Sequence, residues 1–492
     1  MTQKDLKQKA TSGVIWTSIQ KYSTIAINFI SSIILARLLT PYDYGCIGML
    51  TIFMVLAESF IDGGFGSALI QKKRPTQTDY STIFFWNLGM AVLLYTILFI
   101  SAPAIARFYN IPILCSVLRV QGFILFVYAF NIVQRNQLQK QLRFKPLSVV
   151  TIVSSVISLT VAIIMAYHGY GVWSLVSLNI LLAVIPALFF WFYVKWRPVF
   201  SFSWKSFKEL FDFGLYMFLT NLLNNFSSHF QGLLIGKFYN PTIMGYYSKA
   251  GRTEYMASNS ISSIIQQVAY PLYAEVQDDK KKLASIIRRM SITLSYFTFP
   301  LMFVLILCAK PLFIFLYSDR WLASVPYFQI LCLAGLALCL QAVNLLSISA
   351  IGKSKTMFWW TVVKRSVGLS LVVIGLYFYG IYGLLVGVVL NQWFSYSVNI
   401  GLVSTHIGYK WWNQLKDILP IGLVAIIAGI ISYYVGSLCN FSLYGDGLIK
   451  FFIYLVIYMG WSLVVKPEAY TYSMSIIGPL LSKFGRNVKK IV

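Results

Sequence analysis

The stretch Leu35–Gly45, LARLLTPYDYG, ends a long apolar segment with a basic residue, a proline and a glycine. Two hundred residues later the same pattern returns in Ile235–Gly245, IGKFYNPTIMG. The matched positions are Arg37 with Lys237, Pro41 with Pro241, and Gly45 with Gly245. Further matches follow at slightly larger offsets: Pro103 with Pro311, Tyr109 with Tyr317, Tyr170 with Tyr382, and Gly171 with Gly383. Repeated turns in the same order indicate that one unit was duplicated in tandem.

The composition excludes a soluble globular protein. Of the 492 residues, 58% are hydrophobic and only 11% are charged, whereas an ordinary soluble domain has about 25% charged residues. Apolar segments of roughly 20 residues recur along the chain, which is the length of a helix across a hydrocarbon core of ~30 Å. The short alternating strands of a transmembrane barrel are not found. The expected fold is therefore an all-α polytopic membrane protein.

We expect fourteen membrane-spanning helices. The first six lie near residues 13–35, 44–62, 80–102, 113–135, 147–167 and 172–194. After a basic, aromatic linker, eight more lie near residues 211–236, 244–270, 290–309, 325–350, 357–378, 382–404, 418–437 and 448–466. This predicts an N-lobe at 1–200, a C-lobe at 201–405 that repeats it, and two additional helices with a basic cytoplasmic tail at 406–492. Because each repeat has an even number of spans, a pseudo-two-fold axis along the membrane normal should relate the lobes across a central cavity.

The distribution of charge predicts the orientation in the membrane. The chain has 40 Lys and Arg against 15 Asp and Glu, a net charge of +25. Alternate loops and both termini hold 30 of the basic residues when Lys364 and Arg365 are counted with the loop before them, and the intervening loops hold 6. This bias places both termini in the cytoplasm and the repeated turns on the outer face. The first apolar run lacks a small-residue cleavage site, so we expect a retained helix there.

No cofactor, metal site or enzymatic activity is expected. The six cysteines are scattered without CxxC spacing, which is typical of small packed hydrophobic residues. Three histidines offer little for a metal. The chain lacks the nucleotide-binding motif GxxxxGK[ST], and no long outer loop carries the acidic residues of a glycosyltransferase or polymerase.

Two expected helices carry a polar face. In the first span, polar residues recur at helical steps: Thr17, Lys21, Thr24, Asn28 and Ser31. The seventh span, at an offset of 200, carries a similar set of polar residues: Asn221, Asn224, Asn225, Ser228 and His229. Such stripes either line a water-filled cavity shared by the two lobes or form hydrogen bonds between helices. The second alternative leaves Lys21 without a role unless its side chain reaches inward.

Four basic residues are expected deep in the spans: Lys21, Arg119, Lys249 and Arg252. An ionised side chain in mid-bilayer costs at least ~2.5–3.5 kcal/mol, so each needs a partner or water. Arg252 shares one face of the eighth span with Asn259, and Lys249 lies one turn before it on that side. Arg119 either lines the cavity or reaches the outer interface. A cationic cavity suits an anionic substrate, and arginine binds phosphate oxygens well.

Three acidic residues are candidates for ion coupling. Glu58 and Asp62 lie one helical turn apart near the cytoplasmic end of the second span. Asp62 could instead meet the headgroups beside the basic loop at Lys72. Glu254 in the eighth span either pairs with a neighbouring cation or takes up a proton.

The sequence resembles the polysaccharide exporters of the multidrug, oligosaccharidyl-lipid and polysaccharide (MOP) superfamily, in the branch of the colanic acid exporters and O-antigen flippases. The segments that carry the resemblance are TSGVIWTSIQKY at 11–22, ILARLLTPYDYGCIGM at 34–49, GGFGSALIQKKRPTQTDYSTIFFWN at 63–87, APAIARFYN at 102–110, and IGKFYNPTIMGYYSKAGR at 235–252. These motifs mark the family through its turns and loops rather than through substrate contacts.

The resemblance implies a bacterial inner-membrane transporter of 12–14 helices, with a cavity that opens alternately to each side. It implies export of a polyprenyl-pyrophosphate-linked oligosaccharide, as in O-antigen or lipopolysaccharide biosynthesis, with membrane lipids and polysaccharide polymerase machinery as partners and no nucleic acid. Lys21, Arg119, Lys249 and Arg252 would form the family's cationic cavity. A lipid II flippase and a cation-coupled multidrug exporter of the same fold remain alternatives, the latter disfavoured because it would need an acid-rich cavity.

Overall fold

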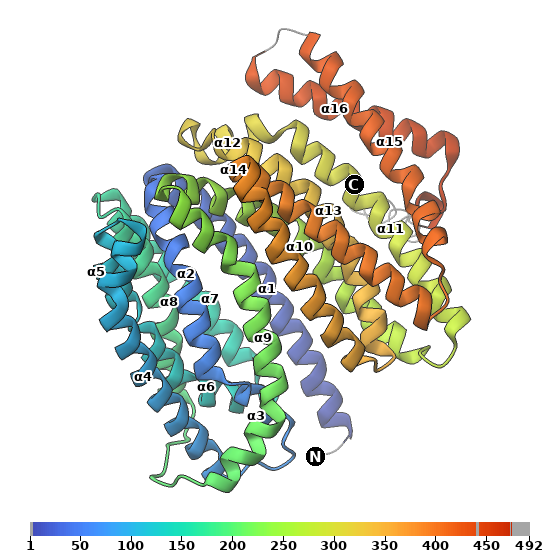
Figure 1. Cartoon of the computed structure of the whole chain (residues 1–492). Coiled ribbons are helices and arrows are strands. Elements are labelled where there is room, and N and C mark those ends of the chain that lie inside the picture. Colours follow the sequence, from blue (N-terminus) through green and yellow to red (C-terminus); the bar gives the residue numbers. More distant parts are fainter. Residues whose placement is uncertain (1–2, 439–441, 473, 475–492) are drawn as a thin grey trace, which may run out of the picture. The chain divides into compact units, whose positions relative to one another are not determined.

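The computed structural model describes residues 3–438, 442–472 and 474. In this part of the chain it contains sixteen α-helices, one short 3₁₀ helix and no strand (Figure 1). The chain divides into two compact units, Met1–Ser248 and Lys249–Val492. The first unit takes in the seventh expected span and the second repeated turn, so it does not follow the expected repeat boundary at residue 200. The lobe boundaries and the symmetry between lobes stay predictions.

The first unit is built from nine helices and the beginning of a tenth. They are α1 (Gln3–Leu38), α2 (Pro41–Asp62), α3 (Phe65–Gln71), α4 (Gln77–Tyr109), α5 (Ile113–Gln121), α6 (Ile124–Lys140), α7 (Phe144–Tyr167), α8 (Val172–Tyr193), α9 (Trp204–Phe238) and α10 (Pro241–Glu275). The second unit holds the rest of α10 and α11 (Lys280–Leu307), α12 (Ala309–Tyr317), η1 (Asp319–Trp321), α13 (Ser324–Ala350), α14 (Ser354–His406), α15 (Trp411–Leu438) and α16 (Leu443–Val465).

The all-α membrane fold is confirmed. Eleven helical segments of the described residues are long and apolar enough to cross a membrane. One of them, Thr356–His406, contains two expected spans that meet at a kink with non-helical backbone at Tyr379 and Gly380. Helices α9 and α10 are 35 residues long each but too polar to be counted among the eleven. The expected segments coincide with helices, except that the fourth, 113–135, is divided between α5 and α6. The number of membrane crossings stays a prediction.

The two repeated turns start their helices in the same way. At α2 the Thr40 side chain accepts the backbone N–H of Asp43, and Asp43 accepts the backbone N–H of Thr40. At α10 the Asn240 side chain accepts the backbone N–H of Ile243 at 2.9 Å. Pro41 and Pro241 occupy the first helical position, where a missing N–H costs nothing. Both turns therefore combine a polar cap with a proline.

The glycines of the repeated turns hold a reciprocal contact between α2 and the first turns of α10. A Cβ atom on Gly45 would lie 1.7 Å from the carbonyl oxygen of Pro241. A Cβ atom on Gly245 would lie 1.9 Å from the carbonyl oxygen of Pro41. No side chain fits at either distance, so the backbones meet only because both residues are glycine. The two turns that repeat in the sequence therefore contact each other in the structure.

A network of hydrogen bonds joins the end of α3 and the start of α4 to α6 and α9. Lys72 donates to Asp79 at 3.1 Å and to Glu209 at 3.0 Å. Burial works to lower the pKa of Lys72, but the two hydrogen bonds outweigh it and raise the pKa. Lys140 donates to the last carbonyls of α3 at Leu69, Ile70 and Lys72. These bonds satisfy a helix end that would otherwise lack partners.

We expect Gly45→Ala to destabilise the protein by about 1–3 kcal/mol, because the backbone of α10 must move away to admit the new methyl group. The measurement is the apparent Tm of the purified protein in detergent. Gly89→Ala is the matched control, since a Cβ there has no neighbour within 4 Å; it should leave the Tm unchanged or raise it slightly. Equal Tm values for the two variants would show that the α2–α10 contact does not stabilise the fold.

Candidate functional site

A polar pocket of about 180 Å³ lies inside the first unit, between α2, α6 and α9. It is lined by Val55, Glu58, Ser59, Asp62, Gly64, Tyr128, Phe218, Asn221 and Asn225. Glu58 and Asp62 are four residues apart on α2, and Asn221 and Asn225 are four apart on α9. Because residues at this spacing share a helix face, two acids face two amides across the pocket. The structure thus joins two groups of residues that sequence analysis had assigned to different roles.

The end of α2 fixes the position of Asp62. The chain turns there through Gly63 and Gly64, whose φ angles are 52° and 77°. This turn brings the Asp62 carboxylate close to Gly66 at the start of α3, where a Cβ atom would lie 3.0 Å from Asp62 Oδ1. Gly64 also meets α9, because a Cβ there would lie 2.2 Å from the carbonyl oxygen of Gly214. The same turn therefore orients the acid and holds α9 against it.

The amide side of the pocket is held by a short chain of hydrogen bonds. Asn225 Nδ2 donates to Ser59 Oγ at 2.8 Å. Ser59 Oγ in turn donates to the carbonyl oxygen of Val55 at 2.7 Å. Asn225 is therefore fixed on the wall of the pocket, while Asn221 lies one turn nearer to its exposed edge.

Neither acid of the pocket forms an ion pair within the part of the chain that the structure describes. Arg135 at the end of α6 supplies the attractive charge that acts on Asp62. Two carboxylates, amide groups and hydroxyls in one small pocket offer oxygen atoms to a proton or a small cation. The ordered groups of this pocket suit an ion better than a bulky apolar ligand.

The polar stripe of α1 is partly enclosed. Lys21, Thr24 and Asn28 are half-buried. Thr24 Oγ1 is buried and has no hydrogen-bond partner among the described residues. The neighbouring face of α1 binds α7, where Ser148 Oγ donates to Gln20 at 3.1 Å. On α9, Asn224 is half-buried and Ser228 is exposed.

The side chain of Arg119 contacts a neighbouring helix. It lies on α5, and its guanidinium is 4.2 Å from the centre of the Phe99 ring on α4. Its Nε donates to the carbonyl oxygen of Phe99 at 3.3 Å. A guanidinium on an aromatic face is stabilised by the ring quadrupole, so this charge has a partner within the first unit.

Lys249 and Arg252 differ sharply in exposure, although they are one turn apart on α10. Lys249 is only 2% exposed, and its ammonium lies 3.9 Å from the centre of the Tyr317 ring and 5.3 Å from that of Trp321. Arg252 is exposed, and its guanidinium has no hydrogen-bond or ion-pair partner among the described residues. Arg252 is thus accessible to a ligand in this conformation, whereas Lys249 is enclosed by aromatic rings.

Glu254 is buried within the second unit, at 8% exposure. Its Oε1 has no hydrogen-bond partner in the described part of the chain. The carboxyl lies in the space left by Gly335 on α13, since a Cβ there would be 2.1 Å from Oε1. Asn259, farther along α10, is half-buried. A buried carboxyl without a cation beside it is costly when ionised, so this position suits a group that can hold a proton.

Sequence analysis missed a buried cation on α14. Lys364 Nζ donates to Asn399 Oδ1 at 2.9 Å, and the two residues are 8% and 1% exposed. The loop count treated Lys364 and Arg365 as loop residues, although both lie inside the expected span at 357–378 and ten residues beyond the start of α14. Two adjacent basic residues this deep in an apolar helix were the signal that could have revealed a buried cation here.

Known proteins resemble the chain over most of its length. A family model described as "Polysaccharide biosynthesis protein" matches residues 34–326, which is more than half of the chain. The chain belongs to the polysaccharide biosynthesis protein family. Among curated relatives, the teichuronic acid biosynthesis protein TuaB of Bacillus subtilis is 27% identical over 72% of this chain and 74% of the relative. The lipopolysaccharide biosynthesis protein WzxC of Escherichia coli is 24% identical over 87% of this chain and 89% of the relative.

A solved structure shows the same fold. The lipid II flippase MurJ, in an inward closed conformation, aligns with a TM-score of 0.73 and 16% identity, over 92% of this chain and 99% of MurJ. The resemblance to polysaccharide exporters that the sequence suggested is confirmed at the level of family and fold. The family match takes in Glu58, Asp62 and Arg252 but ends before Lys364. Among the described residues of this family member, no group of three His, Cys, Asp or Glu could hold a metal ion.

We expect Asn399→Leu to lower the apparent Tm by roughly 5 °C, because it leaves the Lys364 ammonium buried without its acceptor. Adding Lys364→Met should recover most of that loss, since the charge itself is then gone. The double-mutant cycle in detergent measures the coupling. Additive losses in the double variant would mean that the bond between Lys364 and Asn399 does not stabilise α14.

Proposed function

We propose that this protein is a flippase that moves a polyprenyl-pyrophosphate-linked oligosaccharide from the inner to the outer leaflet of the bacterial cytoplasmic membrane. The observation that carries the proposal is the family match over residues 34–326 on a fold shared with MurJ. Its relatives are named for the biosynthesis of teichuronic acid and lipopolysaccharide. The proposed mechanism is alternating access, with both termini in the cytoplasm and the polyprenyl tail remaining in lipid. The protein performs no bond chemistry itself in this proposal, and polymerase machinery acts after it.

Arg252 is the residue proposed to bind the pyrophosphate. It is exposed and unpaired among the described residues, and a guanidinium can donate two parallel hydrogen bonds to phosphate oxygens. Lys21 is half-buried and is proposed as a second contact. Arg119 and Lys249 lie on aromatic rings, so we propose that they contribute positive potential and bind substrate only after a change of conformation. Thr24, Asn28, Asn221, Asn224, Ser228 and Asn259 are proposed to line the polar path.

The pocket in the first unit is proposed to couple export to an ion gradient. Glu58 and Asp62 share one small polar space with Asn225, and neither has an ion-pair partner in the described chain. Binding of a proton or a small cation would remove the cost of their charge inside the membrane. Glu254 is proposed as a second proton-binding group, because its carboxyl is enclosed and one of its oxygens lacks a partner.

A lipid II flippase is the second candidate, favoured by the likeness to MurJ. Lipid II also carries a pyrophosphate on a polyprenyl chain, so the same arginine would serve it. The two candidates differ in the glycan that is moved. A multidrug exporter for cationic drugs gains no support from an exposed, unpaired arginine.

In a strain that lacks its own exporter, the wild-type chain should restore surface polysaccharide. Arg252→Ala should insert normally, export at least tenfold less polymer, and accumulate the lipid-linked intermediate, because a strong phosphate contact is worth about 1.5–3 kcal/mol. Arg252→Lys should retain part of the activity. Lys310→Ala, which removes another exposed cation of the second unit, is the control and should export normally. Normal export by Arg252→Ala would exclude this arginine from the substrate site.

We expect Glu58→Gln and Asp62→Asn to abolish most export in the same strain while keeping the shape of the pocket. Both changes remove a charge that an exchanged ion would neutralise. Asp278→Asn, at an exposed position between α10 and α11, is the control and should export like wild type. Export by both pocket variants at the wild-type level would show that these acids do not couple transport.

A further inference from the structure

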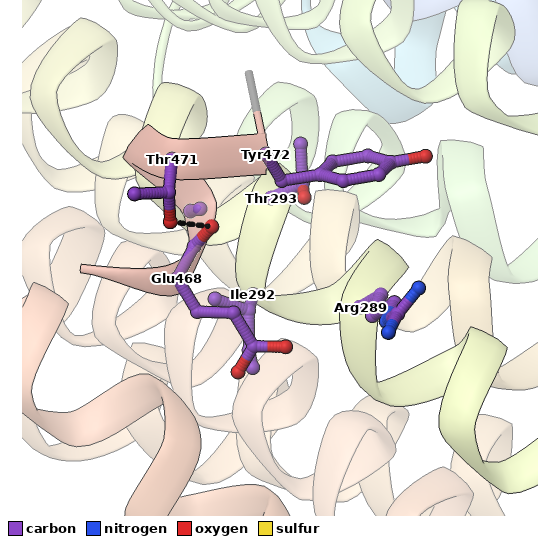
Figure 2. Close-up of a pocket in the computed structure, with 7 residues that line it drawn as sticks. Arg289, Ile292, Thr293, Glu468, Thr471 and Tyr472 are labelled. Atoms are coloured by element: carbon purple, nitrogen blue, oxygen red, sulfur yellow. Dashed lines mark hydrogen bonds between the residues drawn. The ribbon is translucent and has the colours of Figure 1, made fainter. Parts of the chain in front are cut away.

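A second pocket, of about 210 Å³, lies in the second unit beside α11 and the short segment that follows α16. It is lined by Arg289, Ile292, Thr293, Glu468, Ala469, Thr471 and Tyr472. In Figure 2 the Arg289 guanidinium and the Tyr472 ring lie on one side of the pocket, and Glu468 and Thr471 on the other. The Thr471 hydroxyl donates to the carbonyl oxygen of Glu468 at 3.0 Å, as the dashed line shows. The two sides therefore differ in charge.

Glu468 and Asp417 share one arginine, the neighbouring Arg288. Arg288 donates two hydrogen bonds to Asp417, each at 3.0 Å, and binds Glu468 at 2.7 Å. Tyr409 also donates to Asp417. The adjacent Arg289 is exposed, and it has no hydrogen-bond or ion-pair partner among the described residues. One of the two consecutive arginines thus holds two acids in place, and the other presents a guanidinium without a hydrogen-bond partner to the pocket.

The pocket lies at the depth where the apolar surface of the second unit ends. Leu463, Val464 and Val465 at the end of α16 are 58%, 83% and 57% exposed, as lipid-facing residues of a membrane span are. Glu468, the first pocket residue after α16, lies only three positions after Val465. On α11, the exposed Phe297 lies eight residues after Arg289, about 12 Å along the helix at 1.5 Å per residue. Arginine and tyrosine are typical of this headgroup level.

We propose that this pocket binds the phosphate of an anionic phospholipid, with Arg289 as the main contact. The guanidinium would donate two hydrogen bonds to the phosphate oxygens, and Thr293 offers a hydroxyl from the next turn of α11. A zwitterionic headgroup would bring a second positive charge beside the guanidinium, whereas the headgroup of an anionic lipid such as phosphatidylglycerol carries none. The volume is about seven times the ~30 Å³ of one water molecule, which leaves room for more than the phosphate alone. The inference does not depend on which glycolipid the protein moves.

The test uses the purified full-length protein in mixed micelles that contain either phosphatidylglycerol or phosphatidylcholine. Phosphatidylglycerol should raise the Tm of the wild type by about 3 °C more than phosphatidylcholine does, through preferential binding to the folded state. Arg289→Ala should lose most of this difference, and Arg289→Lys should keep part of it. Arg320→Ala removes an exposed arginine outside the pocket and should keep the full difference.

Three results would overturn the proposal. The first is an equal effect of the two lipids on the wild type, and the second is a full phosphatidylglycerol effect in Arg289→Ala. The third would come from adding millimolar inorganic phosphate to the protein in neutral detergent. If phosphate alone reproduces the whole shift, the pocket takes a free anion and not a lipid. Because Arg289 is exposed and unpaired, its substitution is not expected to unfold the protein.

Discussion

A charged side chain inside a hydrocarbon layer persists only where a partner or water offsets the loss of hydration. This constraint divides the ionisable residues of the long helices into two sets. Lys249 lies on Tyr317, Arg119 lies on Phe99, and Lys364 donates to Asn399. Arg252, Glu58 and Asp62 form no ion pair within the described chain. The first set has partners within the fold, and we propose that the second set binds ligand or ion.

The helices that carry these residues are held by close backbone contacts as well as by side chains. Gly45 and Gly245 each meet the carbonyl oxygen of the proline that opens the other turn. Gly64, which lines the pocket that contains Glu58 and Asp62, meets Gly214. In a membrane, where lipid is as apolar as leucine, such contacts give helices a fixed position that burial of apolar surface does not. The glycines at these crossings thus support the geometry of the pocket.

Much of the fold could be read from the sequence, because hydropathy reports the length of each span and the LTPYDYG turn reports a helix start. Contacts between distant segments could not. The i, i+4 spacing of Glu58 with Asp62 and of Asn221 with Asn225 was visible, but the sequence did not show that α2 and α9 face each other. Lys249 was expected to share a cavity with Arg252, and the structure instead encloses it between Tyr317 and Trp321. Those rings lie about seventy residues away in the chain, beyond any helical pattern.

The most direct test is transport by the purified protein in proteoliposomes with an imposed proton or sodium gradient. The substrate is a fluorescent polyprenyl-pyrophosphate oligosaccharide, and the readout is its accessibility to a membrane-impermeant enzyme outside. Our account predicts gradient-dependent appearance of this lipid on the outer face, and no movement of a cationic drug under the same conditions. Efflux of the drug without movement of the lipid-linked oligosaccharide would contradict it.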